Sequence, residues 1–311
     1  MISRINLAIG AVLLSGFTIS FGDAMVKFLG SEVSLWQLIF LRSLLIVVGL
    51  CAIILCAAGK SAVGGFAFRP CSIFWVVVRS FTLAMFLLCA YIGLARMNFA
   101  LVAAVIYTYP IFVLLLMPLF GGAPARGKSW TAIGLAFVGV LLIVRPTHGN
   151  FNIFILFSIA AAIFYALSML ITNTKLTNEN SKLVALWQNT ALMIFGAVGC
   201  AGIQIIQPDF AAEDLFYFGA WQSLTYSQWG TMLVLAAAQL ISAIAVVVAY
   251  QNGPAATIAT VDYCYVLFSL LWGWVILSEA PAFLDLVGIA VIAVAGIMIA
   301  KTGACNAPAQ S

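Results

Sequence analysis

Ten long apolar segments, separated by short connectors, make up almost the whole chain of 311 residues. A helix needs about 20 largely apolar residues to cross the hydrocarbon core of a bilayer. The segments run approximately over residues 5–29, 33–58, 72–95, 98–120, 128–145, 151–172, 182–206, 227–251, 255–277 and 283–301. The sequence therefore predicts an all-α polytopic membrane protein with ten transmembrane helices.

The composition excludes several other classes of protein. Hydrophobic residues make up 65% of the chain and charged residues 7%, whereas a soluble domain carries about 25% charged residues. A soluble enzyme, a secreted disulfide module and a nucleic-acid-binding protein are therefore ruled out. The seven cysteines form no CxxC pair and there is one histidine, His148, so neither a metal site nor a cofactor is expected.

The basic residues of the connectors predict the orientation in the membrane. If the N-terminus is cytoplasmic, eight of them lie inside and three outside. The inside set is Arg4, Lys60, Arg69, Arg126, Lys128, Lys175, Lys182 and Lys301, and the outside set is Lys27, Arg96 and Arg145. The positive-inside rule then predicts that both termini are cytoplasmic. We expect a multi-pass protein of a bacterial-type inner or plasma membrane.

An internal repeat divides the chain. Residues 100–112 (ALVAAVIYTYPIF) align with residues 256–268 (ATIATVDYCYVLF) at six identical positions of thirteen. Further matches recur in the same order, which predicts one repeat over 1–150 and a second over 151–311. Because each repeat has five spans, an odd number, the second is inverted in the membrane. Inverted repeats are typical of secondary transporters that work by alternating access; a duplicated scaffold without transport is the alternative.

Several stretches also resemble a known family. They are LWQLIFLRSLL at 35–45, FWVVVRSFTLAMFLLCAYIGLARMNFALVAAVIYTYPIF at 74–112, GLAFVGVLLIVRP at 134–146, FNIFILFSIAAAIFYALSMLITNTKL at 151–176, LWQN at 186–189 and SEAPAFLDLVGIAVIAVAGIMIA at 278–300. With them the chain resembles the drug/metabolite transporter superfamily, specifically its EamA-type members with two five-span repeats. The first repeat departs from the family's Gly-Glu-Pro-like turn, because it has Gly121-Gly122-Ala123-Pro124, whereas the second keeps an acid at Glu279.

The resemblance implies transport of small amphipathic or zwitterionic metabolites. Amino acids and their derivatives, S-adenosylmethionine-like compounds and riboflavin-like compounds are the substrates it suggests, and a multidrug exporter of the same fold is an alternative. Within the superfamily the chain is most similar to the branch of S-adenosylmethionine and related metabolite carriers. The expected partners are a small-molecule substrate and the lipid bilayer, with no nucleic acid, and the protein is expected to be a monomer or a homodimer.

Four charged residues lie within the predicted spans and are the candidates for membrane depth: Asp23, Arg42, Arg79 and Asp262. Such residues cost about 2.5–3.5 kcal/mol at the bilayer centre on insertion scales, so they usually face a cavity or a partner. Asp262 is the strongest candidate for a substrate site, because no basic residue lies within a helical turn and its counterpart in the first repeat is the apolar Ile106. It would bind a cationic or amino group or carry a proton; pairing with a structural arginine is the alternative.

Each of the other three charges has a structural interpretation; Asp23 and Arg42 have a substrate role as the alternative. Asp23 precedes Lys27 by four residues, which favours an intrahelical ion pair as much as a substrate role. Arg42 lies deep in its span and either holds a substrate carboxylate or neutralises Asp23 or Asp262. Arg79 is about seven residues from the inner end, so we expect a structural role with its stem reaching the cytoplasmic interface.

Aromatic and polar residues complete the candidate site. Tyr107, Tyr109, Tyr263 and Tyr265 lie deep in their spans. Residues two apart point about 200° apart on a regular helix, so at most one tyrosine of each pair should line a pathway.

Three further residues are candidates. Trp187, expected by default at the membrane interface, and Gln188, a hydrogen-bonding residue, follow in the second repeat. Pro110 frees a backbone carbonyl and permits a kink, which suits a gating helix.

A carrier is the leading functional hypothesis. The chain has no GxxxxGK[ST] loop, so ATP is not expected to drive it directly. A membrane-embedded enzyme such as a lipid-modifying hydrolase is the alternative from another class. It would need a nucleophile, base or metal constellation at membrane depth, yet the chain has one histidine and its spans lack paired carboxylates at helical spacing.

Overall fold

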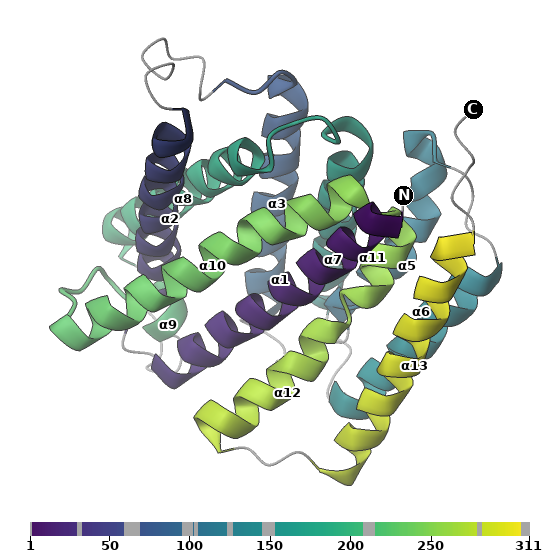
Figure 1. Cartoon of the computed structure of the whole chain (residues 1–311). Helices are drawn as coiled ribbons and strands as arrows, with labels where there is room; N and C mark the ends of the chain where they lie inside the picture. Colours follow the sequence, from purple (N-terminus) through teal and green to yellow (C-terminus); the bar gives the residue numbers. More distant parts are fainter. Residues whose placement is uncertain are drawn as a thin grey trace.

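The computed structural model describes residues 2–29, 33–58, 69–94, 102, 105–122, 127–144, 153–207, 215–278 and 282–305. All regular elements within these residues are helical. They are α1 (Ile2–Leu29), α2 (Leu35–Ala58), α3 (Ile73–Leu94), α5 (Tyr109–Leu116), η4 (Met117–Phe120), α6 (Gly127–Val144), α7 (Ile155–Lys175), α8 (Ser181–Ile206), α9 (Leu215–Phe218), α10 (Tyr226–Asn252), α11 (Ala255–Val261), α12 (Cys264–Leu277) and α13 (Phe283–Cys305) (Figure 1).

The all-α membrane class predicted from the sequence is confirmed. Seven helical segments in the described part of the chain are long and apolar enough to cross a membrane, namely α1, α2, α3, α7, α8, α10 and the combined α11 and α12. Three shorter apolar helices, over 109–120, 129–143 and 283–295, fall where the remaining predicted spans lie. A total of ten spans stays a prediction, because these three are too short to count by length and composition.

Helices from the two halves of the chain pack in pairs. The most extensive contacts join α1 with α10, α3 with α7, α2 with α8 and α6 with α13. Figure 1 shows one of these pairs clearly, with α13 in yellow lying along α6 in teal. Each pair takes one helix from the first half and one from the second, so the halves interleave.

Glycines allow two of these pairs to approach closely. A Cβ atom on Gly139 of α6 would lie 2.9 Å from the carbonyl oxygen of Gly288 on α13. A Cβ atom on Gly196 of α8 would lie 2.7 Å from the backbone nitrogen of Phe40 on α2. Small residues let helix backbones come together in a membrane, where dispersion contacts drive helix association.

Gly196→Ala tests this packing. The added methyl group meets backbone of α2, which cannot move aside as a flexible side chain can, so we expect a loss of about 1–3 kcal/mol of stability. Gly202→Ala on the same helix is the matched control, because nothing lies within 4 Å of a Cβ atom there. Thermal unfolding in detergent should show a lower midpoint for Gly196→Ala alone; equal midpoints for the two variants would contradict close packing of α2 on α8.

Candidate functional site

The ninth predicted span is broken in its middle. Helix α11 ends at Val261, and α12 begins at Cys264. Across the break the amide of Tyr265 donates to the carbonyl oxygen of Asp262 at 3.0 Å, and the amide of Val266 to that of Tyr263, also at 3.0 Å. These i to i−3 bonds replace the i to i−4 pattern of an α-helix. The break therefore places Asp262 at the junction of α11 and α12, where the α-helical hydrogen-bond pattern is interrupted.

The first half has a break at nearly the equivalent position. Residues 105 and 106 are helical, Tyr107 and Thr108 form a turn, and α5 begins at Tyr109. The amide of Thr108 donates to the carbonyl oxygen of Val105 at 3.0 Å. Pro110 lies in the first turn of α5, where a missing N–H costs little because no helical partner is needed. Pro110 thus starts a new helix just after a break.

The two breaks contact each other. The hydroxyl of Tyr263 donates to the carbonyl oxygen of Tyr107 at 2.9 Å. The ring of Tyr107 also lies 6.2 Å from that of Tyr263 and 5.8 Å from that of Tyr265, measured between centroids. A backbone carbonyl without a helical partner must find another donor at membrane depth. A side chain from one broken helix therefore satisfies the backbone of the other.

Tyrosine hydroxyls surround the carboxylate of Asp262. The hydroxyl of Tyr109 donates to Oδ2 of Asp262 at 2.5 Å, and Tyr165 of α7 hydrogen-bonds the same carboxylate. The rings of Tyr109 and Tyr165 meet edge to face, with centroids 4.7 Å apart. Within the described residues the carboxylate interacts with these tyrosines and with no arginine. The alternative of a structural acid–arginine pair at Asp262 thus finds no support there.

Asp23 is tied to the second half of the chain. Its carboxylate accepts a hydrogen bond of 2.6 Å from the hydroxyl of Tyr265 on α12, and the Asp23 side chain is exposed. The positive charge of Arg42 is close enough to interact with this carboxylate. Both interpretations of Arg42, neutralisation of Asp23 and binding of a substrate carboxylate, stay predictions.

The expected position of the Arg79 side chain is wrong, whereas its structural role stays a prediction. Its side chain is fully buried and does not reach the cytoplasmic interface. Nε donates to the hydroxyl oxygen of Thr172 at 2.6 Å and Nη1 to Oε1 of Gln188 at 2.5 Å, while Nη2 has no hydrogen-bond partner among the described residues. The reason is that α7 and α8 pack against α3 and offer polar side chains to the guanidinium, which lowers the cost of burying it.

The structure brings most of the predicted residues toward the broken helices. Asp262, Tyr109, Tyr107, Tyr263, Tyr265 and Asp23 form connected contacts there. Trp187 is partly buried and packs against a hydrophobic cluster of the protein interior. Its expected place at the membrane interface stays a prediction. Tyr165 and Thr172 were missed by sequence reasoning; they lie seven residues apart on α7, a spacing that puts both on one helix face.

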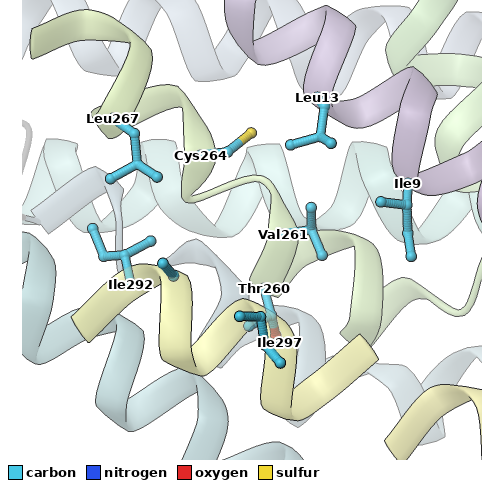
Figure 2. Close-up of a pocket in the computed structure, with 9 residues that line it drawn as sticks. Ile9, Leu13, Thr260, Val261, Cys264, Leu267, Ile292 and Ile297 are labelled. Carbon is cyan, nitrogen blue, oxygen red and sulfur yellow. The ribbon is translucent and has the colours of Figure 1, made fainter. Parts of the chain in front are cut away.

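A separate apolar pocket lies on another side of the broken helix. It has a volume of about 270 Å³ and is lined by Ile9 and Leu13 of α1, Val261 and Cys264 around the break, and Ile292 of α13, among others (Figure 2). Neither Asp262 nor its tyrosine partners line it. Within the described residues, no group of three or more metal-ligating side chains is found.

Interleaved apolar helices around buried charges, with two facing helix breaks, define a membrane protein with an internal polar site, as in transporters. Residues 6–145 match the EamA-like transporter family. The pseudopaline exporter CntI of Pseudomonas aeruginosa is 23% identical over 292 residues, 93% of this chain and 94% of that protein. A riboflavin transporter of Rhizobium johnstonii is 25% identical over 211 residues, 67% of this chain and 64% of that one.

Solved structures share the fold; one crystal structure has a TM-score of 0.72 and 16% identity, and the match covers 97% of this chain and 99% of that one. The chain is similar to members of the drug/metabolite transporter superfamily, and these matches support its membership. It is a transporter, which removes the enzyme alternative. Kinship with the S-adenosylmethionine branch stays a prediction.

Tyr109→Phe tests the contact between Tyr109 and Asp262. Loss of the hydroxyl leaves a partly buried carboxylate short of one donor, so we expect about 1–3 kcal/mol lower stability. The matched control is Tyr226→Phe, because the Tyr226 side chain is 99% exposed. In an Asp262→Asn background the effect of Tyr109→Phe should shrink, since the two residues act as a pair. Equal losses in both backgrounds, measured by thermal unfolding, would rule the interaction out.

Proposed function

We propose that the chain is a secondary transporter that moves small amphipathic or zwitterionic metabolites by alternating access. The observation that carries this proposal is the pair of facing helix breaks, with Asp262 at one of them. In transporters with broken helices, the breaks near the midplane supply the groups that bind substrate and coupling ion. Here they offer a carboxylate, tyrosine hydroxyls and aromatic ring faces.

The helix pairing supports two inverted repeats, over 1–150 and 151–311. If each span corresponds to the one five places later, a contact between spans one and eight requires a contact between spans six and three. The extensive pairs α1 with α10 and α3 with α7 meet this requirement. The pairs α2 with α8 and α6 with α13 join spans to their own counterparts, as expected near a two-fold axis in the membrane plane.

The chemistry of the site supports a substrate with an amino or other cationic group. Asp262 is held by neutral hydroxyls, so a substrate ammonium would gain both a charge partner and hydrogen bonds by displacing them. Two relatives bear names of metabolite transporters, one for pseudopaline and one for riboflavin. We infer amino acids or their derivatives as the class that fits this chain.

The break also suits movement. The segments α11 and α12 are joined by Asp262 and Tyr263 alone, so they can reorient as two rigid pieces, and a few residues suffice for a hinge. Pro110 at the start of α5 permits the same in the first half. We further propose an inner-membrane protein with both termini in the cytoplasm, acting as a monomer or homodimer.

Asp262→Asn should abolish most transport while leaving membrane insertion intact, because the amide removes the negative charge but keeps the shape. Uptake of labelled amino acids into proteoliposomes measures this. Asp285→Asn is the matched control: Asp285 lies in the first turn of α13 and accepts a bond of 2.7 Å from the amide of Ala282, away from the breaks. Transport by Asp262→Asn at the wild-type rate across pH would remove Asp262 from the site.

Counterflow separates a carrier from a pore. A carrier accelerates labelled uptake when unlabelled substrate is preloaded, because the site returns across the membrane loaded. Absence of acceleration for every solute that enters the vesicles would contradict alternating access.

A further inference from the structure

The apolar pocket beside the broken span has no part in the polar contacts around Asp262. It has a volume of about 270 Å³ and is lined by residues of α1, α11, α12 and α13. Figure 2 shows the side chains of Leu13, Val261, Cys264 and Ile292 around the same space. An apolar cavity of about 150 Å³ inside a protein already stays dry and binds benzene. The size and character of this pocket therefore suit an apolar ligand rather than water.

The polar atoms that line the pocket are already engaged. The hydroxyl of Thr260 donates to the carbonyl oxygen of Ala256, in its own helix, at 2.8 Å. The thiol of Cys264 is directed at the carbonyl oxygen of Val12, 4.0 Å away. The other described lining residues are aliphatic, namely Ile9, Leu13, Val261, Leu267, Ile292, Ala293 and Ile297. A ligand thus meets hydrocarbon and no free hydrogen-bond donor among these residues, which selects a hydrocarbon chain.

Three helices place the pocket at the level of the bilayer's hydrocarbon core. Ile9 lies about two turns after the start of α1, Cys264 about two and a half turns after the start of α11, and Ile297 about two turns before the end of α13. These helix ends point toward the same end of the molecule (Figure 1). With a rise of 1.5 Å per residue, the pocket lies roughly 10–14 Å from them. Because the core is about 30 Å thick, the surroundings at this level are the acyl chains of one leaflet.

The edge of the pocket continues into the surface that faces lipid. The side chains of Leu13 and Ile297, both lining residues, are 38% and 58% exposed, and that of Val294 beside them is 55% exposed. Lipid tails are as apolar as leucine, so an acyl chain can leave the bulk bilayer and enter from the side at little cost. It gains dispersion contacts with lining atoms that an empty pocket leaves without partners.

We propose that this pocket binds one acyl chain of a bilayer phospholipid. The chain lies between α13 and the junction of α11 and α12, because Val261 and Cys264, on either side of that junction, line the pocket. Reorientation of α11 against α12 therefore changes the shape of this lipid site. The binding of the chain does not depend on the proposed transport function.

Photolabelling with a phospholipid tests the proposal directly. Full-length protein is reconstituted into phosphatidylcholine bilayers that contain a small fraction of phosphatidylcholine with a diazirine in the middle of one chain. After irradiation, mass spectrometry of peptides locates the adducts. The half-buried Ile9 and Val261 should be labelled at least as strongly as Ile194 and Val198 of α8, which are 57% and 65% exposed and report contact with bulk lipid.

Ala293→Phe should empty the site of lipid. Ala293 lines the pocket from α13, so the aromatic ring takes up the space of the chain. Labelling of Ile9 and Val261 should fall about tenfold or more, equivalent to about 1.4 kcal/mol, while labelling of Ile194 is unchanged. Ala290→Phe is the matched control, because Ala290 is exposed on the same helix and is not among the lining residues; it should be labelled as the wild type is.

Thermal unfolding in detergent gives a second measurement on the same variants. A ligand bound by the folded state alone raises the unfolding temperature. Added phosphatidylcholine should therefore stabilise the wild type and Ala290→Phe more than Ala293→Phe. Before lipid is added, Ala293→Phe should unfold at the same or a higher temperature than the wild type, because its ring fills the void.

Three outcomes would overturn the proposal. One is weaker labelling of both Ile9 and Val261 than of Ile194 in the wild type, and another is unchanged labelling of these two residues in Ala293→Phe. The third is crosslinking between two protein chains at Leu13 or Ile297 in place of lipid adducts, which would make a second copy the occupant. None of these measurements uses transport, so absent labelling leaves the transport function standing, and absent counterflow leaves the lipid site standing.

Discussion

The bilayer requires every polar group at membrane depth to be satisfied within the protein, and the rest of this structure depends on that requirement. Long helices satisfy their own backbone, but the spans containing Tyr107 and Asp262 are interrupted. The bond from Tyr263 to the carbonyl of Tyr107 repairs one interruption with a side chain from the other. Thus the break at Tyr107 is tolerated because the break at Asp262 lies against it, which ties the two halves of the chain together.

The same requirement governs the charges. Tyr109 and Tyr165 hydrogen-bond the carboxylate of Asp262, and Tyr265 hydrogen-bonds that of Asp23. Neutral donors of this kind hold a carboxylate in place without cancelling its charge. A full ion pair would be more costly for a substrate to displace, because separating buried opposite charges leaves both uncompensated. Tyrosine therefore suits a carboxylate that must exchange partners.

Most helix boundaries could be predicted from the sequence, because the bilayer fixes how long an apolar segment must be. The segment predicted over 182–206 appears as Ser181–Ile206, and that over 227–251 as Tyr226–Asn252. The break at Asp262 could not be predicted in this way, since hydropathy continues across it. The expectation that at most one tyrosine of each pair lines a pathway assumes an unbroken helix. It does not apply at 107–109 or 263–265, where the helices are broken.

The candidate site was predicted in part. Asp262 stood out because an acid within an apolar segment has few explanations. Arg79 was misjudged because its depth along α3 was known but its rotation was not; rotation depends on α7 and α8, which are far away in sequence. Tyr165 and Thr172 left no signal beyond polarity on one helix face, which many packed helices share.

In the proposed mechanism, the symmetric pairing of helices and the asymmetric placement of charged residues have different tasks. The helix pair α3 and α7 contains Arg79 bonded to Thr172, whereas the corresponding pair α1 and α10 is joined by a neutral bond of 3.0 Å between Ser15 and Ser242. Asp262 likewise has the apolar Ile106 as its counterpart. Two similar repeats can exchange conformations with little net change in free energy, because each repeat adopts the conformation that the other gives up. A single set of charges, present in one copy, is then offered first to one side of the membrane and then to the other. If both repeats contained these charges, the chain would have two sites that face opposite sides of the membrane. Rocking of the repeats would then not move a single site from one side to the other.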